Sequence, residues 1–278
     1  MTFLLAACGS SGTTGPTSTP SAPASLPPTE VAGGEEARLL FEYDPQVPLA
    51  IEEVSMSEVD GAEVHDISYA GGSGDTRVSA YLVVPVGEGP FAGVVFMHWG
   101  GGSRSSFLEE AKKLATEGVV SLLVNAPFRQ DAGYFAEVVV GLRRGTDLLS
   151  ARSDVDVSRL GFVGHSWGAA FGAILADVDR RFRTYILMAG VPSLSEFWDS
   201  EDMVPFDGID HIGRAAPASL FFQYADRDEN VTAGMSIQFY DAGSEPKRIE
   251  SYDTTHSFAS EQSSSDRSEW LAEELGLP

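Results

Sequence analysis

A serine bracketed by two glycines ends an apolar run in LGFVGHSWGAAFGAIL, residues 160–175. Gly164 and Gly168 flank Ser166, and glycines permit a backbone turn too sharp for residues that carry a Cβ atom. Such a turn between a strand and a helix lifts the serine hydroxyl off the sheet edge, where it can act as a nucleophile. Ordinary turns also contain this pattern by chance, so the rest of the chain has to supply the partners of the serine.

A nucleophilic serine needs a base, normally a histidine that a carboxylate orients. The chain has five histidines, and His256 follows the last predicted strand, where a loop can bring its imidazole towards Ser166. The other four fit other roles: a structural hairpin position for His65, a strand end for His98, packing beside the turn for His165 and a surface position for His211. We therefore expect His256 to be the base.

The carboxylate is expected in LFFQYADRDENV, residues 220–231, where a buried strand breaks into an acidic turn. Asp226, Asp228 and Glu229 compete for the role within this turn. The order of serine, acidic turn and histidine along the chain is the order found in α/β-hydrolases. The three pieces together predict a serine hydrolase that forms an acyl-enzyme intermediate.

Backbone amides for the negative oxygen of a tetrahedral intermediate are expected in HWGGGS, residues 98–103. Its glycines let the backbone approach a substrate closely, and preorganised N–H groups stabilise such an oxyanion. One donor is expected in this stretch, with the amides of Trp99 and Gly100 as candidates. The amide of Trp167 is expected to be the second donor. The alternative is a glycine-rich turn that binds nothing.

The elements that position these residues alternate between strand and helix. Strands are predicted at 92–99, 119–125, 160–164, 183–190, 218–225 and 247–253, with an antiparallel hairpin at 62–71 and 76–85 before them. Helices are predicted from 107 to 117, with Ser106 and Glu109 as a capping box and Gly118 as the stop, and at 134–152, 167–176 and 265–275. The alternation predicts a mostly parallel sheet with helices on both faces, whose chemistry lies at the carboxyl ends of the strands.

Composition limits the partners. The 278 residues carry a formal net charge of −23, which argues against nucleic-acid binding and against electrostatic docking on anionic lipid. A neutral or cationic small-molecule substrate fits this charge better than a polyanion. Cys8 is the only cysteine, so internal disulfides and cysteine-based metal cages are excluded. We expect no metal and no cofactor, and the sequence gives no oligomeric state.

The first residues resemble a bacterial lipoprotein signal, because FLLAAC ends in Leu-Ala-Ala-Cys. In that class the signal is cleaved before the cysteine, whose sulfur then receives lipid. This predicts a signal peptide over 1–8 with lipidation at Cys8, a disordered Ser/Thr/Pro/Gly linker over 9–35 that spans about 30 Å, and a hydrolase domain over 36–278. The protein is then exported and held on the outer face of a bacterial membrane by its lipid anchor alone; the alternative is an ordinary secretory signal and a secreted protein.

Four stretches resemble the dienelactone hydrolase-related branch of the α/β-hydrolases, in order over roughly residues 60–260: VSAYLVVPVGEGPFAGVVFMHWGG, VDVSRLGFVGHSWGA, FFQYADRDENV and YDTTHSF. The resemblance implies the α/β-hydrolase fold. In that family the acid lies three residues after a small residue and three before an aliphatic one, which matches Ala225, Asp228 and Val231 and so implies Asp228. Dienelactone hydrolases carry a cysteine nucleophile, whereas this chain has Ser166, so the resemblance favours the esterase relatives.

The expected function is therefore an exported serine esterase that cleaves small carboxylic esters with Ser166, His256 and Asp228. The alternatives are a non-catalytic binding lipoprotein on a hydrolase scaffold, a dienelactone-type hydrolase and a peptidase of the prolyl-oligopeptidase type. For this peptidase, nothing in the sequence forms the propeller domain. Specificity is expected in the irregular stretch 191–217, whose large apolar residues either wall an acyl pocket or only cover the core: Phe197, Trp198, Met203 and Phe206.

The anchor is open to a direct test. If Cys8 is lipidated, the native protein sediments with membranes, and Cys8→Ser releases it into the soluble fraction. Stable anchoring is expected because a lipoprotein cysteine carries several acyl chains, whereas one chain binds only marginally. A wild-type protein that is wholly soluble and carries an unmodified Cys8 contradicts this prediction.

Overall fold

Nine strands form one sheet in the computed structural model, which describes residues 34–72 and 76–278. The strands are β1 Glu52–Val59, β2 Ala62–Ala70, β3 Arg77–Pro85, β4 Phe91–Met97, β5 Val119–Val124, β6 Val155–His165, β7 Thr184–Met188, β8 Ser219–Ala225 and β9 Lys247–Tyr252. The helices are α1 Gly34–Leu39, α2 Leu108–Ala115, α3 Ala132–Ser150, α4 Trp167–Val178, α5 Leu194–Trp198, the 3₁₀-helix η1 Glu201–Phe206, α6 Gly208–Ile212, α7 Ala233–Ala242 and α8 Glu261–Leu275.

The described elements all belong to one compact unit, 32–278. Helix α1 begins at Gly34, two residues before the predicted start of the domain. The predicted signal peptide, Cys8 and residues 9–33 of the predicted linker lie outside the described residues. None of the described helices is long and apolar enough to cross a membrane.

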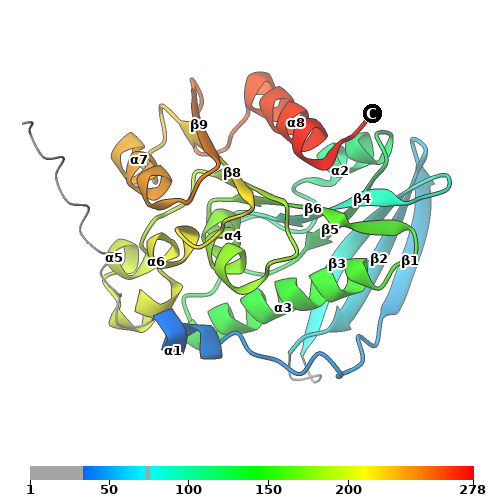
Figure 1. Cartoon of the computed structure of the whole chain (residues 1–278), viewed down its shortest axis with the longest axis horizontal. Helices are drawn as coiled ribbons and strands as arrows, with labels where there is room; N and C mark the ends of the chain where they lie inside the picture. The colour runs from blue at the N-terminus through cyan, green and yellow to red at the C-terminus, as the bar shows by residue number, and fades with distance from the viewer. Residues whose placement is uncertain (1–33, 73–75) are drawn as a thin grey trace, which may run out of the picture. The chain divides into compact units, whose positions relative to one another are not determined.

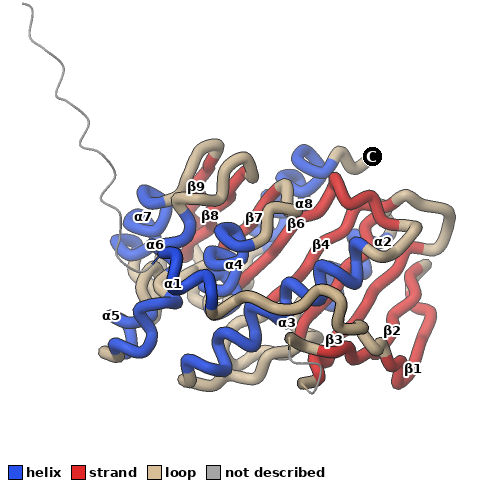
Figure 2. The backbone as a smooth tube through the Cα atoms, turned by 60° about the horizontal axis from the view of Figure 1, so that its bottom comes forward, coloured by secondary structure: helices blue, strands red, loops and turns tan. Residues whose placement is uncertain are grey.

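The strands follow one another across the sheet in the order β1-β2-β3-β5-β4-β6-β7-β8-β9 (Figure 2). Strands β1, β2, β3 and β5 pair antiparallel, and the pairs from β5 through β4 and β6 to β9 are parallel. The prediction of a mostly parallel sheet that follows an antiparallel hairpin is confirmed. Strand β1 was not predicted, because every one of its residues is exposed and five of its eight residues are Glu or Ser.

Helices cover both faces of the sheet, as predicted (Figure 1). The alternation of side chains along β4 sends Val95 and Met97 into the core beneath α3 and α4, and sends Val94 and Phe96 into the core beneath α2 and α8. Strands buried on both faces need continuous apolar runs. This is why the apolar stretch 92–97 forms a central strand.

The predicted capping box of α2 is wrong. Phe107 occupies the N-cap position and no side chain caps the helix. The Ser106 hydroxyl instead accepts the N–H of Ser103 at 3.0 Å, which closes the preceding turn. The hydroxyl is therefore committed to the loop that carries the predicted oxyanion donors, one residue too early to cap the helix.

The turn between β6 and α4 has the geometry that its glycines suggest. Ser166 adopts φ 54° and ψ −108°, a backbone conformation rare for residues with a side chain. A Cβ atom on Gly164 would lie 2.3 Å from the carbonyl oxygen of Gly168, and one on Gly168 would lie 2.1 Å from that of Met97. The Ser166 N–H donates to the carbonyl of Met188 at 2.7 Å, which fixes the turn to β7.

Two glycines at the second position of a helix provide a matched test of this packing. Gly168→Ala should lower the free energy of unfolding by at least about 3 kcal/mol, because the new methyl group meets backbone that cannot move aside. Gly234→Ala in α7 should change it by less than about 1 kcal/mol, because the nearest atom to its added Cβ is the Thr232 hydroxyl at 3.8 Å. Urea denaturation measures both, and equal effects contradict the role given to Gly168.

Candidate active site

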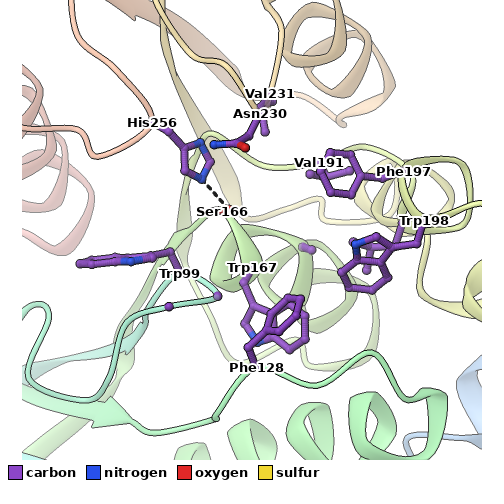
Figure 3. Close-up of a pocket in the computed structure, with 14 residues that line it drawn as sticks. Trp99, Phe128, Ser166, Trp167, Val191, Phe197, Trp198, Asn230, Val231 and His256 are labelled. Atoms are coloured by element: carbon purple, nitrogen blue, oxygen red, sulfur yellow. Dashed lines mark hydrogen bonds between the residues drawn. The ribbon is translucent and has the colours of Figure 1, made fainter.

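Three residues from distant parts of the chain form a chain of hydrogen bonds at the carboxyl edge of the sheet. Ser166 follows β6, Asp228 follows β8 and His256 follows β9. His256 Nε2 lies 2.9 Å from Ser166 Oγ (Figure 3), and His256 Nδ1 lies 2.7 Å from Asp228 Oδ2. Because a carboxylate can only accept, Nδ1 carries the proton and Nε2 is free to accept the proton of the serine hydroxyl. The predicted serine, acid and histidine are thus brought together.

The three candidate carboxylates in the acidic turn after β8 differ in burial and in hydrogen bonding. The side chain of Asp228 is 1% exposed, and its Oδ1 accepts the N–H groups of Asn230 at 2.8 Å and Val231 at 2.9 Å. Its other oxygen is thereby aimed at His256. Asp226 and Glu229 are exposed. The buried Val231 anchors the end of the turn in the core, so the backbone itself orients Asp228.

His165 contacts His256 through a hydrogen bond to its backbone and through its ring. Its Nε2 lies 2.7 Å from the carbonyl oxygen of His256, and its ring packs 5.2 Å from the rings of His256 and Trp99. A carbonyl only accepts, so Nε2 carries the proton. Burial, followed by the nearby His256, lowers the pKa of His165 to about 3. His165 is therefore a neutral donor that fixes the loop carrying His256, and this agrees with its predicted packing role.

His98 holds the loop that carries the predicted oxyanion donors. Its Nε2 accepts the N–H of Ala126 at 3.1 Å, so Nδ1 is protonated and donates to the carbonyl of Trp99 at 2.7 Å. Burial lowers the pKa of His98 and keeps the ring neutral. The sequence indicated only that His98 ends a strand. Its role depends on two backbone partners, which are 1 and 28 positions away, and only folding brings the second one close.

The predicted oxyanion donors face the same space as the serine. Trp99, Gly100 and Trp167 all line a cavity that contains Ser166 and His256. Trp167 is the first residue of α4, and the first amides of a helix have no acceptor inside the helix. The positive end of the helix dipole adds to the attraction for a negative oxygen there. The arrangement can therefore stabilise negative charge beside Ser166.

The cavity beside Ser166 has a volume of about 300 Å³ and mostly apolar walls. Of the candidates in 191–217, Phe197 and Trp198 line it. Met203 and Phe206 do not; they are 3% and 1% exposed and belong to the core. Phe206 packs against other core rings, 5.3 Å from Phe135, because the short helices of this stretch turn it away from the site. Its prediction as a pocket residue is corrected accordingly.

Sequence reasoning did not single out several residues of the cavity wall, although Val191 and Leu194 lie in the stretch 191–217 in which specificity was expected. Phe128 follows β5, Val191 follows β7, Leu194 begins α5 and Asn230 lies in the acidic turn. Single apolar residues in loops are normal on protein surfaces. No signal in the sequence therefore marks Phe128, and only the folded chain brings it to Ser166.

Stretch 191–217 is anchored to the helix that follows the nucleophile. The buried His211 places Nδ1 2.9 Å from Asp177 of α4 and Nε2 3.0 Å from the carbonyl of Pro205. Although burial opposes ionisation, hydrogen bonds from His211, Arg214 and Arg38 hold the pKa of Asp177 below its ordinary value. The expectation that His211 lies on the surface is wrong, because the partner that buries it is 34 residues earlier in the chain.

The arrangement can perform nucleophilic acyl transfer. A hydroxyl on a strained turn faces an imidazole nitrogen that can accept its proton, and a buried carboxylate holds that imidazole. The residues whose amides could bind an oxyanion line the same cavity. Within the described residues, no group of three or more His, Cys, Asp or Glu side chains could hold a metal ion.

The low pKa of His165 predicts a measurable dependence of stability on pH. Between the folded value of about 3 and the ordinary value of 6.5, the unfolded chain binds a proton at His165 that the folded protein does not. Stability should therefore fall as pH falls through this window. His165→Gln should make the slope of unfolding free energy against pH shallower by up to about 1.4 kcal/mol per pH unit. Urea titrations at pH 4 to 7 measure the slope, and an unchanged slope contradicts the assignment.

No protein-family model and no curated protein matches the chain. Its fold does match solved structures. An acetyl xylan esterase from Paenibacillus sp. R4 aligns over 87% of this chain and 93% of its own, with 18% identity and a TM-score of 0.73. Acetyl xylan esterase 1 from Thermoanaerobacterium sp. JW/SL YS485 aligns over the same shares, with 16% identity and a TM-score of 0.75.

An S-formylglutathione hydrolase from Agrobacterium tumefaciens aligns over 81% of this chain and 100% of its own, with 15% identity and a TM-score of 0.66. Identities this low speak to the fold alone. Together with the strand order and the helices on both faces, these matches show that the chain has the α/β-hydrolase fold.

Proposed function

We propose that the protein is a serine hydrolase that cleaves small carboxylic esters through an acyl-enzyme intermediate. The observation that carries the proposal is the hydrogen-bonded chain from Ser166 through His256 to Asp228 at the wall of an apolar cavity. The similarity in fold to proteins described as esterases and hydrolases supports the same class of reaction.

The proposed reaction begins when Ser166 Oγ attacks the ester carbonyl. His256 Nε2 takes the hydroxyl proton, and Asp228 stabilises the resulting imidazolium. The carbonyl oxygen becomes negative and accepts hydrogen bonds from the amides of Trp167 and of the Trp99–Gly100 loop. His256 then gives its proton to the leaving alcohol. Water attacks the acyl-enzyme by the same steps, which releases the acid and restores the serine.

The alternatives have less support. A binding protein on a hydrolase scaffold would not require Asp228 to be buried and aimed at His256 by two backbone amides. For a peptidase of the prolyl-oligopeptidase type, residues 34–72 and 76–278 form a single nine-stranded sheet with its helices and no propeller. A dienelactone-type hydrolase has less support because this chain carries Ser166 where dienelactone hydrolases carry a cysteine.

We further propose that the protein is exported and held at a membrane by lipid on Cys8. The support for this is the sequence FLLAAC, followed by a Ser/Thr/Pro/Gly-rich segment that would separate the acidic domain from the membrane.

Turnover of p-nitrophenyl acetate tests the proposed esterase. Wild type should hydrolyse it, and Ser166→Ala should remove activity while the protein stays folded by circular dichroism. Asp228→Asn should lower kcat by up to about 10⁴-fold, because the amide allows His256 to adopt the wrong tautomer.

The matched control is Asp226→Asn, which removes an exposed carboxylate from the same turn and should change kcat less than about twofold. Full activity of a folded Ser166→Ala protein would rule out the proposed mechanism. Loss of activity in Asp226→Asn with none in Asp228→Asn would reassign the acid.

A further inference from the structure

The cavity beside Ser166 has two unlike sides (Figure 3). His256 and Asn230 lie together on one side of Ser166, and Trp198, Trp167 and Phe128 lie on the other. Val191 and Phe197 lie near Trp198 (Figure 3), and Ala170 and Leu194 line the same cavity. A substrate that spans Ser166 therefore meets His256 and Asn230, with Val231 beside them, at one end, and an aromatic chamber formed by the rings of Trp198, Trp167 and Phe128 at the other.

The chemistry of the proposed reaction decides which end of the ester enters which side. Four groups surround the tetrahedral carbon: Ser166 Oγ, the oxyanion, the leaving oxygen and the acyl carbon. The leaving oxygen has to receive a proton from His256 Nε2, which places the alcohol on the side of His256 and Asn230. The oxyanion is directed at the backbone amides. The acyl group is then directed into the aromatic chamber.

The aromatic chamber has a fixed end wall. Trp198 meets the rings of Phe128, Trp167 and Phe135 at centroid distances of 6.0, 5.9 and 5.7 Å, mostly edge to face. Its helix α5 is fastened by Ser195, whose N–H and hydroxyl both bond the carboxylate of Asp207. A wall held by ring contacts and by a secured helix cannot move far to admit a longer chain.

The aromatic chamber also lacks a partner for a charge. None of the residues that line the cavity, all of them in the described part of the chain, is Lys or Arg. A carboxylate buried against these rings would lose its hydration without gaining a cation. The total cavity, at about 300 Å³, is at the lower limit for small-molecule sites, and the alcohol occupies part of it.

We infer that the enzyme selects esters of short, uncharged acyl groups of about four to six carbons, that it rejects acyl groups bearing a carboxylate, and that Trp198 sets the upper length. This inference rests on the proposed function, since it assigns the acyl side of the same site. Each methylene added within the aromatic chamber should raise kcat/KM by about fourfold, and a chain that reaches Trp198 should lose that gain.

The test uses p-nitrophenyl esters, which keep the leaving group constant. For wild type, kcat/KM should rise about 15-fold from acetate to butyrate, which adds two methylenes, and fall at octanoate. The p-nitrophenyl monoester of succinic acid, which matches butyrate in chain length but ends in a carboxylate, should react at least about 100-fold more slowly than butyrate.

Trp198→Ala should raise the octanoate-to-butyrate ratio of kcat/KM by about tenfold or more, because it removes the end wall. Trp198→Leu is the milder variant if the alanine protein is unstable, and should shift the ratio in the same direction. The matched control is Val204→Ala, which alters an exposed apolar residue of η1 that does not line the cavity and should leave the ratio unchanged.

The outcomes separate this inference from the proposed function. If wild type hydrolyses the neutral esters through Ser166 but accepts the succinate ester equally well, or if neither Trp198 variant changes the length profile, the inference is overturned and the esterase stands. If no neutral ester is hydrolysed, both are overturned.

Discussion

The close approach of α4 to β4 and β6 is the constraint on which the site depends. A strand that turns into a helix within one residue forces Ser166 to φ 54°, and it forces the first turn of α4 against the carbonyl oxygen of Met97. Only residues without a Cβ fit at Gly164 and Gly168. The strain of the turn is held by the packed sheet on either side, through the bond from Ser166 to Met188. As a result, the half-buried Ser166 lines the cavity, and Trp167 begins α4, where the first amides have no acceptor inside the helix.

Two buried histidines that do no proton transfer in the proposed mechanism hold the loops around this turn. His98 ties the Trp99 loop to the chain after β5, and His165 bonds the backbone of His256. Burial lowers the pKa of both rings, which favours the neutral forms that these supporting bonds require. Asp228 is oriented by backbone amides in the same way. The reactive groups are thus positioned by neutral or fully buried partners, which agrees with a preorganised site.

The sequence predicted those parts of the site that depend on local patterns. The glycine bracket around Ser166 and the broken strand before Asp228 each lie at one end of a strongly apolar run, and His256 follows the last predicted strand. The sequence could not predict the parts that depend on long-range packing. His211 was expected on the surface, but its bond to Asp177, which lies far away in the sequence, buries it. Phe206 was a candidate for the cavity wall, but the short helices direct it into the core, where it packs against Phe135. The capping box at Ser106 failed because its hydroxyl bonds the preceding turn. Strand β1 has no buried face that could mark it.

Covalent labelling of the nucleophile tests the central claim, that His256 and Asp228 activate Ser166, most directly. A fluorophosphonate reacts with an activated serine and leaves a stable phosphonyl ester, so peptide mapping by mass spectrometry locates the reactive side chain. The account predicts one adduct per chain, on Ser166, formed in the folded wild type and strongly slowed in His256→Ala. An adduct on a different residue, or a folded protein that forms none, would contradict it.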